Sequence, residues 1–401
     1  MPLESNPILL RSTSAALTVL LGVLIALTPL GTDTWAPTLA ALGDSLGAPV
    51  RAAQLTVTAF FAGIALGQLG WGPLSDRFGR RPCLLAGLAL ACAATAAGAA
   101  AAGIEGVTLA RFAQGLGMSC GPVIARSIVR DLHSHEQAAR LFSTMTIVFS
   151  VVPIAGPLVG AALLAAGGWR AVLVFFALVS AVLFVAAAAG LRETAPAERA
   201  SIHPLQLFGA FRAVLAEPRF VAPFAAMLLG QIGIFAFVTN SAFVLIKAQG
   251  ITPAAYGLIF AGVMLGQITG AWASRRLVLE IGIARLLKTG ATLALVAGIG
   301  AAALAWAGVS HWLAVLIPFM LYTGGMALIT PNATAAALTP FPRAAGAASS
   351  LIGAAQFAVG AAISALLGVL FDGTARPMAS VAAIGGAGAF LIERYYLRGK
   401  G

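Results

Sequence analysis

The stretch FAGIALGQLGWGPLSDRFGRRP, Phe61–Pro82, decides the fold. Its first part is apolar and rich in glycine, and its second part is a short segment dense in charge. The first part returns near the middle of the 401-residue chain as FAGVMLGQ, Phe260–Gln267, without the acidic residue that follows the first copy. An internal repeat of this kind indicates two halves of one ancestral unit. We therefore expect a duplicated scaffold and a charged loop that belongs to the first half alone.

The composition indicates a membrane protein. The chain is 60% hydrophobic and 9% charged, whereas soluble proteins carry about 25% charged residues. Many apolar runs of about 20 residues favour helices over a β-barrel. The net charge of +11 would also suit nucleic acid, but Lys and Arg in cytoplasmic loops explain it more simply. We expect an all-α protein embedded in the lipid bilayer that binds no nucleic acid.

Twelve apolar segments are long enough to cross about 30 Å of hydrocarbon. They are Ser14–Leu42, Ala52–Trp71, Pro82–Gly103, Val107–Val129, Ala138–Ala165, Trp169–Gly190, Phe220–Ile246, Pro253–Ala273, Leu286–Trp306, His311–Ala337, Ala344–Phe371 and Pro377–Leu397. The first is interrupted by charge and proline and lacks a convincing cleavage site, so we interpret it as a retained span rather than a signal peptide.

The longest polar stretch, Leu191–Arg219, separates the first six segments from the last six. The sequence thus predicts an N-terminal six-helix bundle over 1–190, a cytoplasmic linker over 191–219 and a C-terminal six-helix bundle over 220–401. Positive charge sets the orientation. With both termini cytoplasmic, most Lys and Arg face inward, and those facing outward are Arg51, Arg170, Lys247 and Arg376.

Charges within membrane spans are expensive and therefore point to function, and this filter selects Asp33 and Arg111. Asp33 has Pro29 and Pro37 at i−4 and i+4, which kink the helix and leave carbonyl groups free. Burial disfavours a charged carboxylate and a nearby cation favours it, so a changing environment can load and release a proton. The alternative is a hydrated residue at the outer boundary of the span.

Arg111 begins a helix face that continues through Gln114, Gly115 and Met118. An arginine that stays charged should face the protein interior, near an acid or a polar ligand. The alternative is an arginine that only joins helices through backbone carbonyls.

In the fifth segment, proline and glycine share one face at Pro153, Gly156, Pro157 and Gly160. Small residues allow close helix packing and prolines bend the segment, which predicts a hinge or a close interface without chemistry. Buried amides and aromatics either line a polar route or join helices. The candidates for a substrate cavity are Gln114, Met118, Phe235, Asn240, Asn332 and Gln356.

The cysteines and histidines predict no metal site, disulfide framework or cofactor. The three cysteines lie in apolar stretches without metal-ligand spacing. The four histidines are dispersed, with His133 and His135 in a predicted loop, so they give no cluster for a membrane-embedded transferase.

Several motifs, in the right order, resemble the major facilitator superfamily. The segment Gly72–Pro82 is similar to its signature loop between helices 2 and 3, and Arg111–Gly117 with Ala125–Asp131 resembles its helix 4 motif. The segment Pro153–Gly160 resembles the helix 5 motif of antiporters, and Thr32–Gly47 the end of helix 1 in drug/proton antiporters. The sequences RDLHSHEQAAR and NATAAALTPFPRAAGAASSLIGAAQF point to the Bcr/CflA group of bicyclomycin and chloramphenicol exporters.

The resemblance implies twelve transmembrane helices in two pseudo-symmetric six-helix bundles that work by alternating access. It further implies proton coupling by Asp33 and Arg111. It assigns gating between the access states to the charged loop, whose residues are Gly72, Asp76, Arg77, Gly79, Arg80 and Arg81. A second acid, which some multidrug relatives carry two turns before Asp33, is absent here, so neutral or zwitterionic compounds become candidates beside cationic drugs.

We therefore expect a monomeric, multi-pass transporter of the bacterial inner membrane that is not an enzyme. It would export small amphipathic compounds, such as chloramphenicol- or bicyclomycin-like molecules, in exchange for protons. An exporter of the same fold dedicated to an amino acid or a nucleobase-like metabolite is the main alternative.

Overall fold

The structure is a computed structural model that describes residues 15–132, 135–195, 204–341 and 345–398. His133 and His203 lie outside the described residues. Every element of the described part is helical. In chain order the elements are α1 (Ala15–Asp33), η1 (Ala36–Thr38), α2 (Leu39–Ser45), α3 (Val50–Phe78), α4 (Arg80–Ala100), α5 (Ile104–Met118), α6 (Cys120–Leu132), α7 (His135–Gly190), α8 (Pro204–Leu215), α9 (Pro218–Ala242), η2 (Phe243–Ala248), α10 (Pro253–Trp306), α11 (Leu313–Leu338), α12 (Ala345–Leu370) and α13 (Arg376–Arg398).

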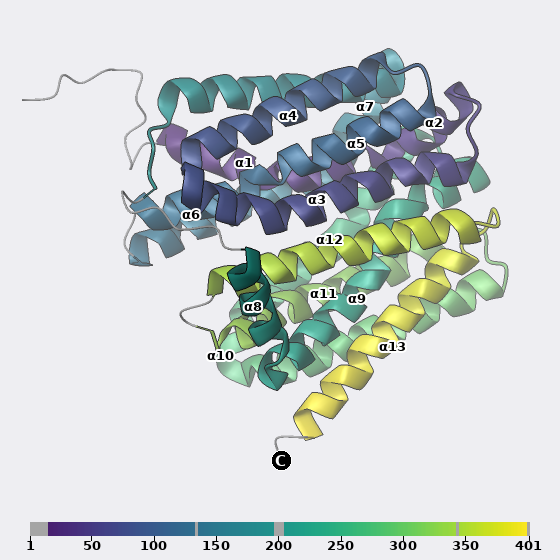
Figure 1. Cartoon of the computed structure of the whole chain (residues 1–401). Helices are drawn as coiled ribbons and strands as arrows, with labels where there is room; N and C mark the ends of the chain where they lie inside the picture. The colour runs from purple at the N-terminus through teal and green to yellow at the C-terminus, as the bar shows by residue number, and fades with distance from the viewer. Residues whose placement is uncertain (1–14, 133–134, 196–203, 342–344, 399–401) are drawn as a thin grey trace, which may run out of the picture.

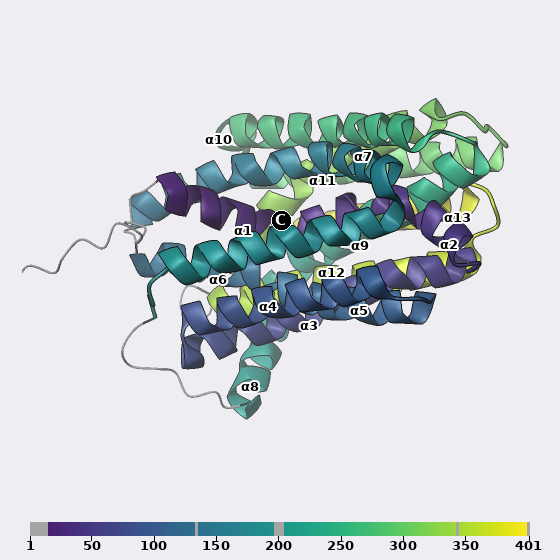
Figure 2. The ribbon, with the colours of Figure 1, turned by 90° about the horizontal axis from the view of Figure 1, so that it is seen from above.

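The long helices run in roughly the same direction, as Figures 1 and 2 show, with α1 and α3–α7 on one side and α9–α13 on the other. Buried apolar side chains form two clusters, one drawn mainly from residues 17–191 and the other mainly from residues 214–389. Each side therefore has a core of its own. The helices α3 and α12 pack against each other between the two cores.

Eight described helical segments are long and apolar enough to cross a membrane. Two of them are double, because α7 breaks at Gly167–Gly168 and α10 breaks at Gly282. With α5–α6 and α13 as further crossings, the arrangement is consistent with twelve. Large apolar side chains within the spans, such as Leu258 and Val296, are exposed on the surface, where lipid rather than water would cover them.

The two copies of the repeated sequence make the same kind of helix contact. A Cβ atom at Gly67 of α3 would lie 2.9 Å from the carbonyl oxygen of Leu116 in α5. At the equivalent Gly266 of α10, it would lie 1.9 Å from the carbonyl oxygen of Met320 in α11. In both copies, only glycine lets the two backbones approach this closely. The repeat thus encodes one packing arrangement that is used twice.

The charged segment after the first copy is helical, and the prediction of a loop between Gly72 and Pro82 is wrong in this respect. The helix α3 continues to Phe78 and α4 begins at Arg80. Gly79 alone joins them, with φ 105° and ψ 155°, a conformation that disfavours other residues. Pro82 is accommodated in the first turn of α4, where N–H groups lack an intrahelical partner.

Two other predicted segments are also subdivided. The first predicted span ends as a helix at Asp33 and resumes through η1 and α2, because Pro37 cannot donate a backbone hydrogen bond. The polar stretch between the two sets of spans contains α8, which packs against α12 (Figure 1).

The repeat contact gives a test of the packing. We expect Gly266→Ala to lower stability by about 1–3 kcal/mol, because the added methyl group overlaps a backbone atom that cannot move aside cheaply. The control is Gly300→Ala in the same helix, where a Cβ atom would meet nothing within 4 Å. The measurement is the thermal unfolding midpoint of both purified variants in detergent. Equal midpoints would contradict the packing argument.

Candidate functional site

The two ends of the molecule differ in how tightly the two sides are joined. We call the end where α3 meets α4 the linker face and the end that carries α2 and η2 the far face. At the far face, Lys247 Nζ lies 3.0 Å from Asp44 Oδ1. Gln54 Nε2 donates to the Thr239 carbonyl at 3.3 Å, and Ser364 Oγ donates to the Gln54 carbonyl at 3.3 Å. Contacts between α2 or α3 and α9, η2 or α12 thus close the far face.

Toward the linker face, the two sides enclose a cavity of about 460 Å³. Side chains from α3 and α6 form one wall, and side chains from α8, α11 and α12 form the other. The lining residues are Gln68, Leu69, Gly72, Pro73, Asp76, Val123, Arg126, Ser127, Arg130, Phe211, Leu338, Gly346, Ser349 and Ser350. None of the six residues predicted to line a substrate cavity is among them.

Asp33 is the last residue of α1, and its side chain is buried at 7% exposure. Within the described part of the chain, no hydrogen bond or ion pair engages its carboxyl group. A Cβ atom at Gly156 of α7 would lie 3.1 Å from the Asp33 Cβ, so the backbone of α7 packs closely against Asp33. A carboxylate in such surroundings is costly. The site therefore favours the neutral acid in this conformation.

Arg111 lies in α5 and is fully buried. Its Nη1 donates to Gln114 Oε1 at 2.6 Å, and its Nη2 donates to the Gly31 carbonyl of α1 at 2.9 Å. The guanidinium carbon lies 3.9 Å from the ring centre of Phe60 and 4.8 Å from that of Trp35. Two hydrogen bonds and two aromatic faces thus replace water around the charge.

Arg111 and Asp33 do not form an ion pair. The arginine reaches the backbone two residues before the acid and makes no contact with its carboxylate. In this conformation Arg111 therefore holds the end of α1 in place and leaves the carboxyl group uncompensated. Its Nε atom has no hydrogen-bond partner among the described residues, so it retains a donor for another group.

The four residues of the predicted hinge lie in α7, where Gly156 and Gly160 contact the end of α1. A Cβ atom at Gly160 would lie 2.2 Å from the Thr34 carbonyl oxygen and 2.9 Å from Pro37 Cγ. Pro153 and Pro157 lie within the same helix. The glycine face of α7 and the proline-containing end of α1 are therefore two sides of one contact.

The residues predicted for the cavity lie in separate places. Gln114 accepts the hydrogen bond from Arg111, and Met118 lies near Gly31, where an added Cβ atom would be 3.1 Å from its sulfur. Phe235 of α9 belongs to an aromatic cluster with Phe61 of α3 and Phe357 of α12, at ring-centre distances of 5.2 and 6.0 Å. This cluster joins the two sides.

The other three amides predicted for the cavity also differ from one another. Asn332 donates to Ser274 Oγ at 2.8 Å and to the Leu328 carbonyl at 2.7 Å, so it joins α11 to α10. Gln356 Nε2 lies 3.4 Å from Met227 Sδ. Asn240 is fully buried, and in the part of the chain that the structure describes neither atom of its amide has a hydrogen-bond partner. Of the three, Asn240 is the one with hydrogen-bonding capacity to spare.

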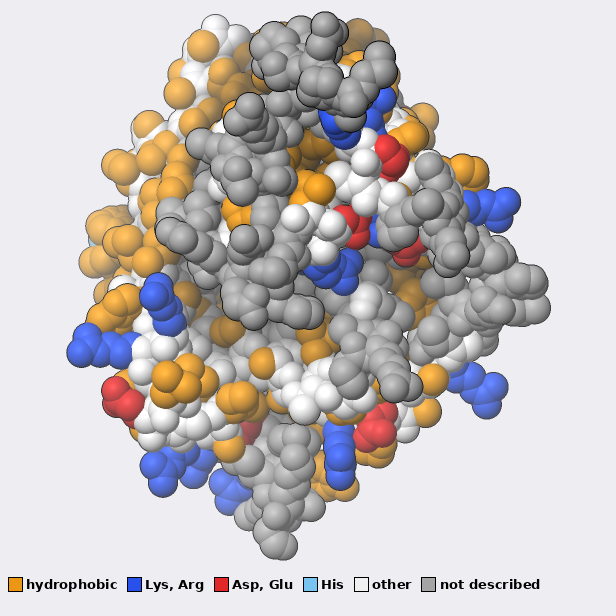
Figure 3. Space-filling model, turned by 90° about the vertical axis from the view of Figure 1, so that its left-hand side faces the viewer, with side chains coloured by type: hydrophobic (Ala, Val, Ile, Leu, Met, Phe, Trp, Pro, Cys, Tyr) orange, Lys and Arg blue, Asp and Glu red, His pale blue; other side chains and the backbone are white. Residues whose placement is uncertain are grey.

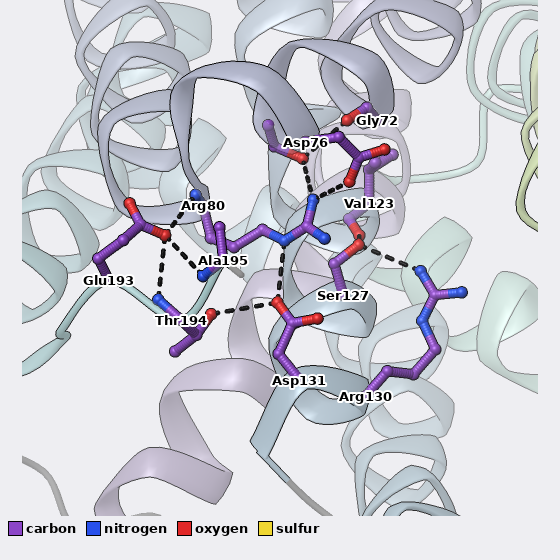
Figure 4. A network of polar contacts seen from close by, with 11 residues as sticks. Gly72, Asp76, Arg80, Val123, Ser127, Arg130, Asp131, Glu193, Thr194 and Ala195 are labelled. Carbon is purple, nitrogen blue, oxygen red and sulfur yellow. Dashed lines mark hydrogen bonds and ion pairs between the residues drawn. The ribbon is translucent and has the colours of Figure 1, made fainter. Parts of the chain in front are cut away.

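A compact polar network lies at the linker face, centred on Arg80 (Figure 4). Its Nε donates to Asp131 Oδ2 at 2.9 Å, and its Nη1 donates to Ser75 Oγ at 2.9 Å and pairs with Asp76 Oδ1. Such charge-assisted bonds are stronger than neutral ones. Because Asp76, Arg80 and Asp131 belong to α3, α4 and α6, the network ties three helices together at one point.

Glu193, just beyond α7, closes this network from the other side (Figure 4). Its Oε1 accepts the backbone N–H groups of Arg80 at 2.8 Å, Ala195 at 2.9 Å and Thr194 at 3.0 Å. Burial alone would raise the pKa of the Glu193 carboxyl, but hydrogen bonds from these N–H groups and that of Arg81 hold the pKa below its usual value of 4.5. Glu193 thus accepts these bonds as a carboxylate.

The other predicted gating residues lie around this network. Gly72 lines the cavity, and its carbonyl accepts a hydrogen bond from Ser75 Oγ at 2.9 Å. Arg81 Nη2 donates to the Ala188 carbonyl at 2.7 Å. The Arg77 guanidinium lies 5.5 Å from the Phe78 ring centre, and Gly79 forms the helix junction.

Several residues of the buried polar sites do not stand out in the sequence. Glu393 of α13 is buried at 5% exposure, and its Oε1 has no hydrogen-bond partner among the described residues. It is thus a further ionisable residue within a span, besides Asp33 and Arg111. Glu393 lies in the last turns of a predicted span, where a charged residue is expected at the membrane boundary. Nothing in the sequence marked Phe60 or Glu193, whereas Trp35 stands in the quoted motif around Asp33. Within the described residues, no group of three or more His, Cys, Asp or Glu could hold a metal ion.

Comparison with known proteins defines the class. The pattern of the Major Facilitator Superfamily matches residues 21–365. The chain belongs to this superfamily and is a multi-pass membrane transporter rather than an enzyme. Among solved structures, the D-xylose-proton symporter shares the fold with a TM-score of 0.76 at 15% identity, over 95% of this chain and 96% of the other.

The sequence relatives include proteins named for drug resistance. The chain is 29% identical to a bicyclomycin resistance protein homolog of Haemophilus influenzae, over 89% of this chain and 90% of the relative. It is 26% identical to multidrug resistance protein D of Escherichia coli, over 91% of both chains. These relatives agree with the subgroup expected from the motifs.

The hydrogen bonds to Glu193 give a pH-dependent prediction. A carboxyl whose pKa is lowered in the folded protein adds stability above its unfolded pKa, and this is lost as the pH falls through the folded value. We expect Glu193→Gln to unfold at a lower temperature than the wild type at about pH 7, with the gap closing below about pH 4.5. Unfolding of both proteins in detergent across this range measures the gap, and a gap independent of pH would contradict the assignment.

Proposed function

We propose that the chain is a drug/proton antiporter of the inner membrane, exporting small amphipathic compounds as protons move inward. The family, and the names of the relatives, support export of drug-like molecules. The observation that carries the proposal is the environment of Asp33. Asp33 is buried against α7 without a partner among the described residues, and such an acid changes its proton occupancy when its surroundings change.

Alternating access supplies that change of surroundings. In the state described here, the far face is closed and a cavity opens toward the linker face. Opening the far face would separate the end of α1 from α9 and α10, which η1 contacts, and would expose Asp33 to water. The acid would then gain or lose its proton according to the state, and a ligand that binds one state better shifts the balance.

The polar network around Arg80 is proposed as the latch of this cycle, and the contact between α7 and the end of α1 as its hinge. The latch involves Asp76, and the hinge involves Gly156 and Gly160. Of the residues expected to meet substrate, Asn240 is the strongest candidate, because its amide is buried and unpartnered. The remaining five have packing or hydrogen-bond partners within the protein.

We further propose that residues 1–190 and 220–401 act as the two moving bundles, joined by a cytoplasmic linker over 191–219. The linker face would then be cytoplasmic, together with both termini. Figure 3 supports this orientation, since Lys and Arg side chains surround that face, as the positive-inside rule requires. The transporter would act as a monomer and bind no nucleic acid.

The central test is Asp33→Asn, which keeps the shape of the side chain and removes its titration. In inverted membrane vesicles with an imposed pH gradient, we expect chloramphenicol to dissipate the gradient through the wild type and to have no such effect with the variant. Asp372→Asn, an exposed acid, is the control and should behave as the wild type. Normal chloramphenicol-induced proton movement through Asp33→Asn would overturn the coupling role.

Arg111→Lys tests the arginine. Lysine keeps the charge but cannot bond Gln114 and the Gly31 carbonyl in the same geometry or stack between two rings. A charge-assisted hydrogen bond is worth about 1.5–3 kcal/mol, so the same vesicle assay should show transport reduced at least about tenfold. Equal transport at equal expression would show that the geometry around Arg111 is unnecessary.

A further inference from the structure

The cavity carries a pair of arginines that the proposed coupling does not use. Arg126 and Arg130 are one turn apart on α6, and both line the cavity with exposed side chains. Like charges at this spacing on a helix repel each other and destabilise it. An anion between them would remove this repulsion.

The surrounding groups leave the pair uncompensated. Arg130 Nη2 donates to Ser127 Oγ at 3.2 Å, and no carboxylate of the described residues pairs with its charge. Among the described residues, no hydrogen bond or ion pair engages Arg126. The acid among the lining residues is Asp76, and its carboxylate is paired with Arg80. The α6 wall of the cavity is therefore electropositive. In Figure 4, Arg130 points away from the network around Arg80.

The rest of the cavity suits the remainder of an amphipathic molecule. Ser349 and Ser350 of α12 offer hydroxyl groups, and apolar side chains lie beside them, among them Leu69, Phe211 and Leu338. The volume of about 460 Å³ falls within the range of about 300–1,000 Å³ that is usual for small-molecule sites. The cavity thus offers two cations at one place and an apolar surface at another.

We propose that this cavity binds the oxyanion of an amphipathic organic acid, with the carboxylate held by Arg126 and Arg130 and the apolar part against the opposite wall. Arginine donors match a carboxylate in two-point geometry. The inference rests on the proposed export function and adds to its substrates compounds that carry a carboxylate, zwitterions included. Cationic drugs without an acidic group would be disfavoured at this site.

The binding test uses three probes of one shape: para-butylbenzoate, its uncharged methyl ester and para-butylbenzylamine. Titration calorimetry on the full chain in phosphatidylcholine nanodiscs should show binding of the benzoate, with the other two at least about tenfold weaker. Arg126→Gln should weaken benzoate binding by a similar factor, and Arg126→Lys by less. The control is Arg276→Gln on α10, whose exposed guanidinium stacks on Trp272 and should leave binding unchanged.

The proposal is overturned if the benzoate does not bind, if the ester or the amine binds with the same affinity as the benzoate, or if Arg126→Gln leaves benzoate affinity unchanged. A phospholipid phosphate is the other source of an oxyanion, so the titration is repeated in nanodiscs that contain phosphatidylglycerol. Unchanged benzoate affinity is expected. Strong competition by this lipid would instead assign Arg126 and Arg130 to binding of a lipid phosphate.

Because no proton gradient is used in the titration, Asp33→Asn should bind the benzoate normally. Wild-type protein that binds the benzoate but shows no chloramphenicol-induced proton movement would contradict the antiport proposal alone. Wild-type protein that shows this proton movement but does not bind the benzoate would contradict this inference alone.

Discussion

The architecture around the membrane acid depends on one buried cation. Arg111 has no access to water, so its charge must be solvated by the protein itself, through Gln114, the Gly31 carbonyl and the faces of Phe60 and Trp35. These groups come from α1, α3 and α5, and the arginine therefore fixes how the three helices meet. Asp33 follows two residues after the bonded carbonyl, at the point where α1 ends. The position of the acid is thus set by a cation that does not neutralise it.

This separation of roles extends to the linker face. There Arg80 is bonded directly to Asp76 and Asp131, with Glu193 fixing its backbone, and the charges are compensated. The paired charges hold helices together, whereas the acid at the end of α1 has no partner among the described residues. A transporter needs both kinds of site, because a compensated ion pair resists motion and an uncompensated acid responds to its surroundings. The chain places them at different depths.

Much of this organisation could be predicted from the sequence, because hydrophobic length and the internal repeat reflect constraints that act along the chain. Residue type and spacing predict the spans, the breaks near Gly168 and Gly282, and the close packing at Gly156 and Gly160.

Contacts between residues far apart in the sequence could not be predicted in this way. Asn332 looks like a cavity residue in the sequence but joins α10 to α11, and Glu393 looks like a boundary residue but is buried. The extension of α3 and α4 up to Gly79 could not be predicted, because a high density of charge is typical of loops. The first and last turns of helices tolerate charged residues equally well.

The junction at Gly79 has a mechanical consequence. A single residue between two helices contributes two soft torsions, so α3 and α4 can swivel about one point but cannot slide apart. Since Arg80 begins α4 and bonds to Asp76 in the last turn of α3, any swivel large enough to reorient the helices must first break that bond. The repeat in the second half has a glycine at its own break, Gly282, but the sequence around it, LVLEIGIARL, lacks the Asp–Arg arrangement. The two halves are therefore alike in shape and unequal in stiffness, and the first half is the one whose bending is tied to the state of an ion pair.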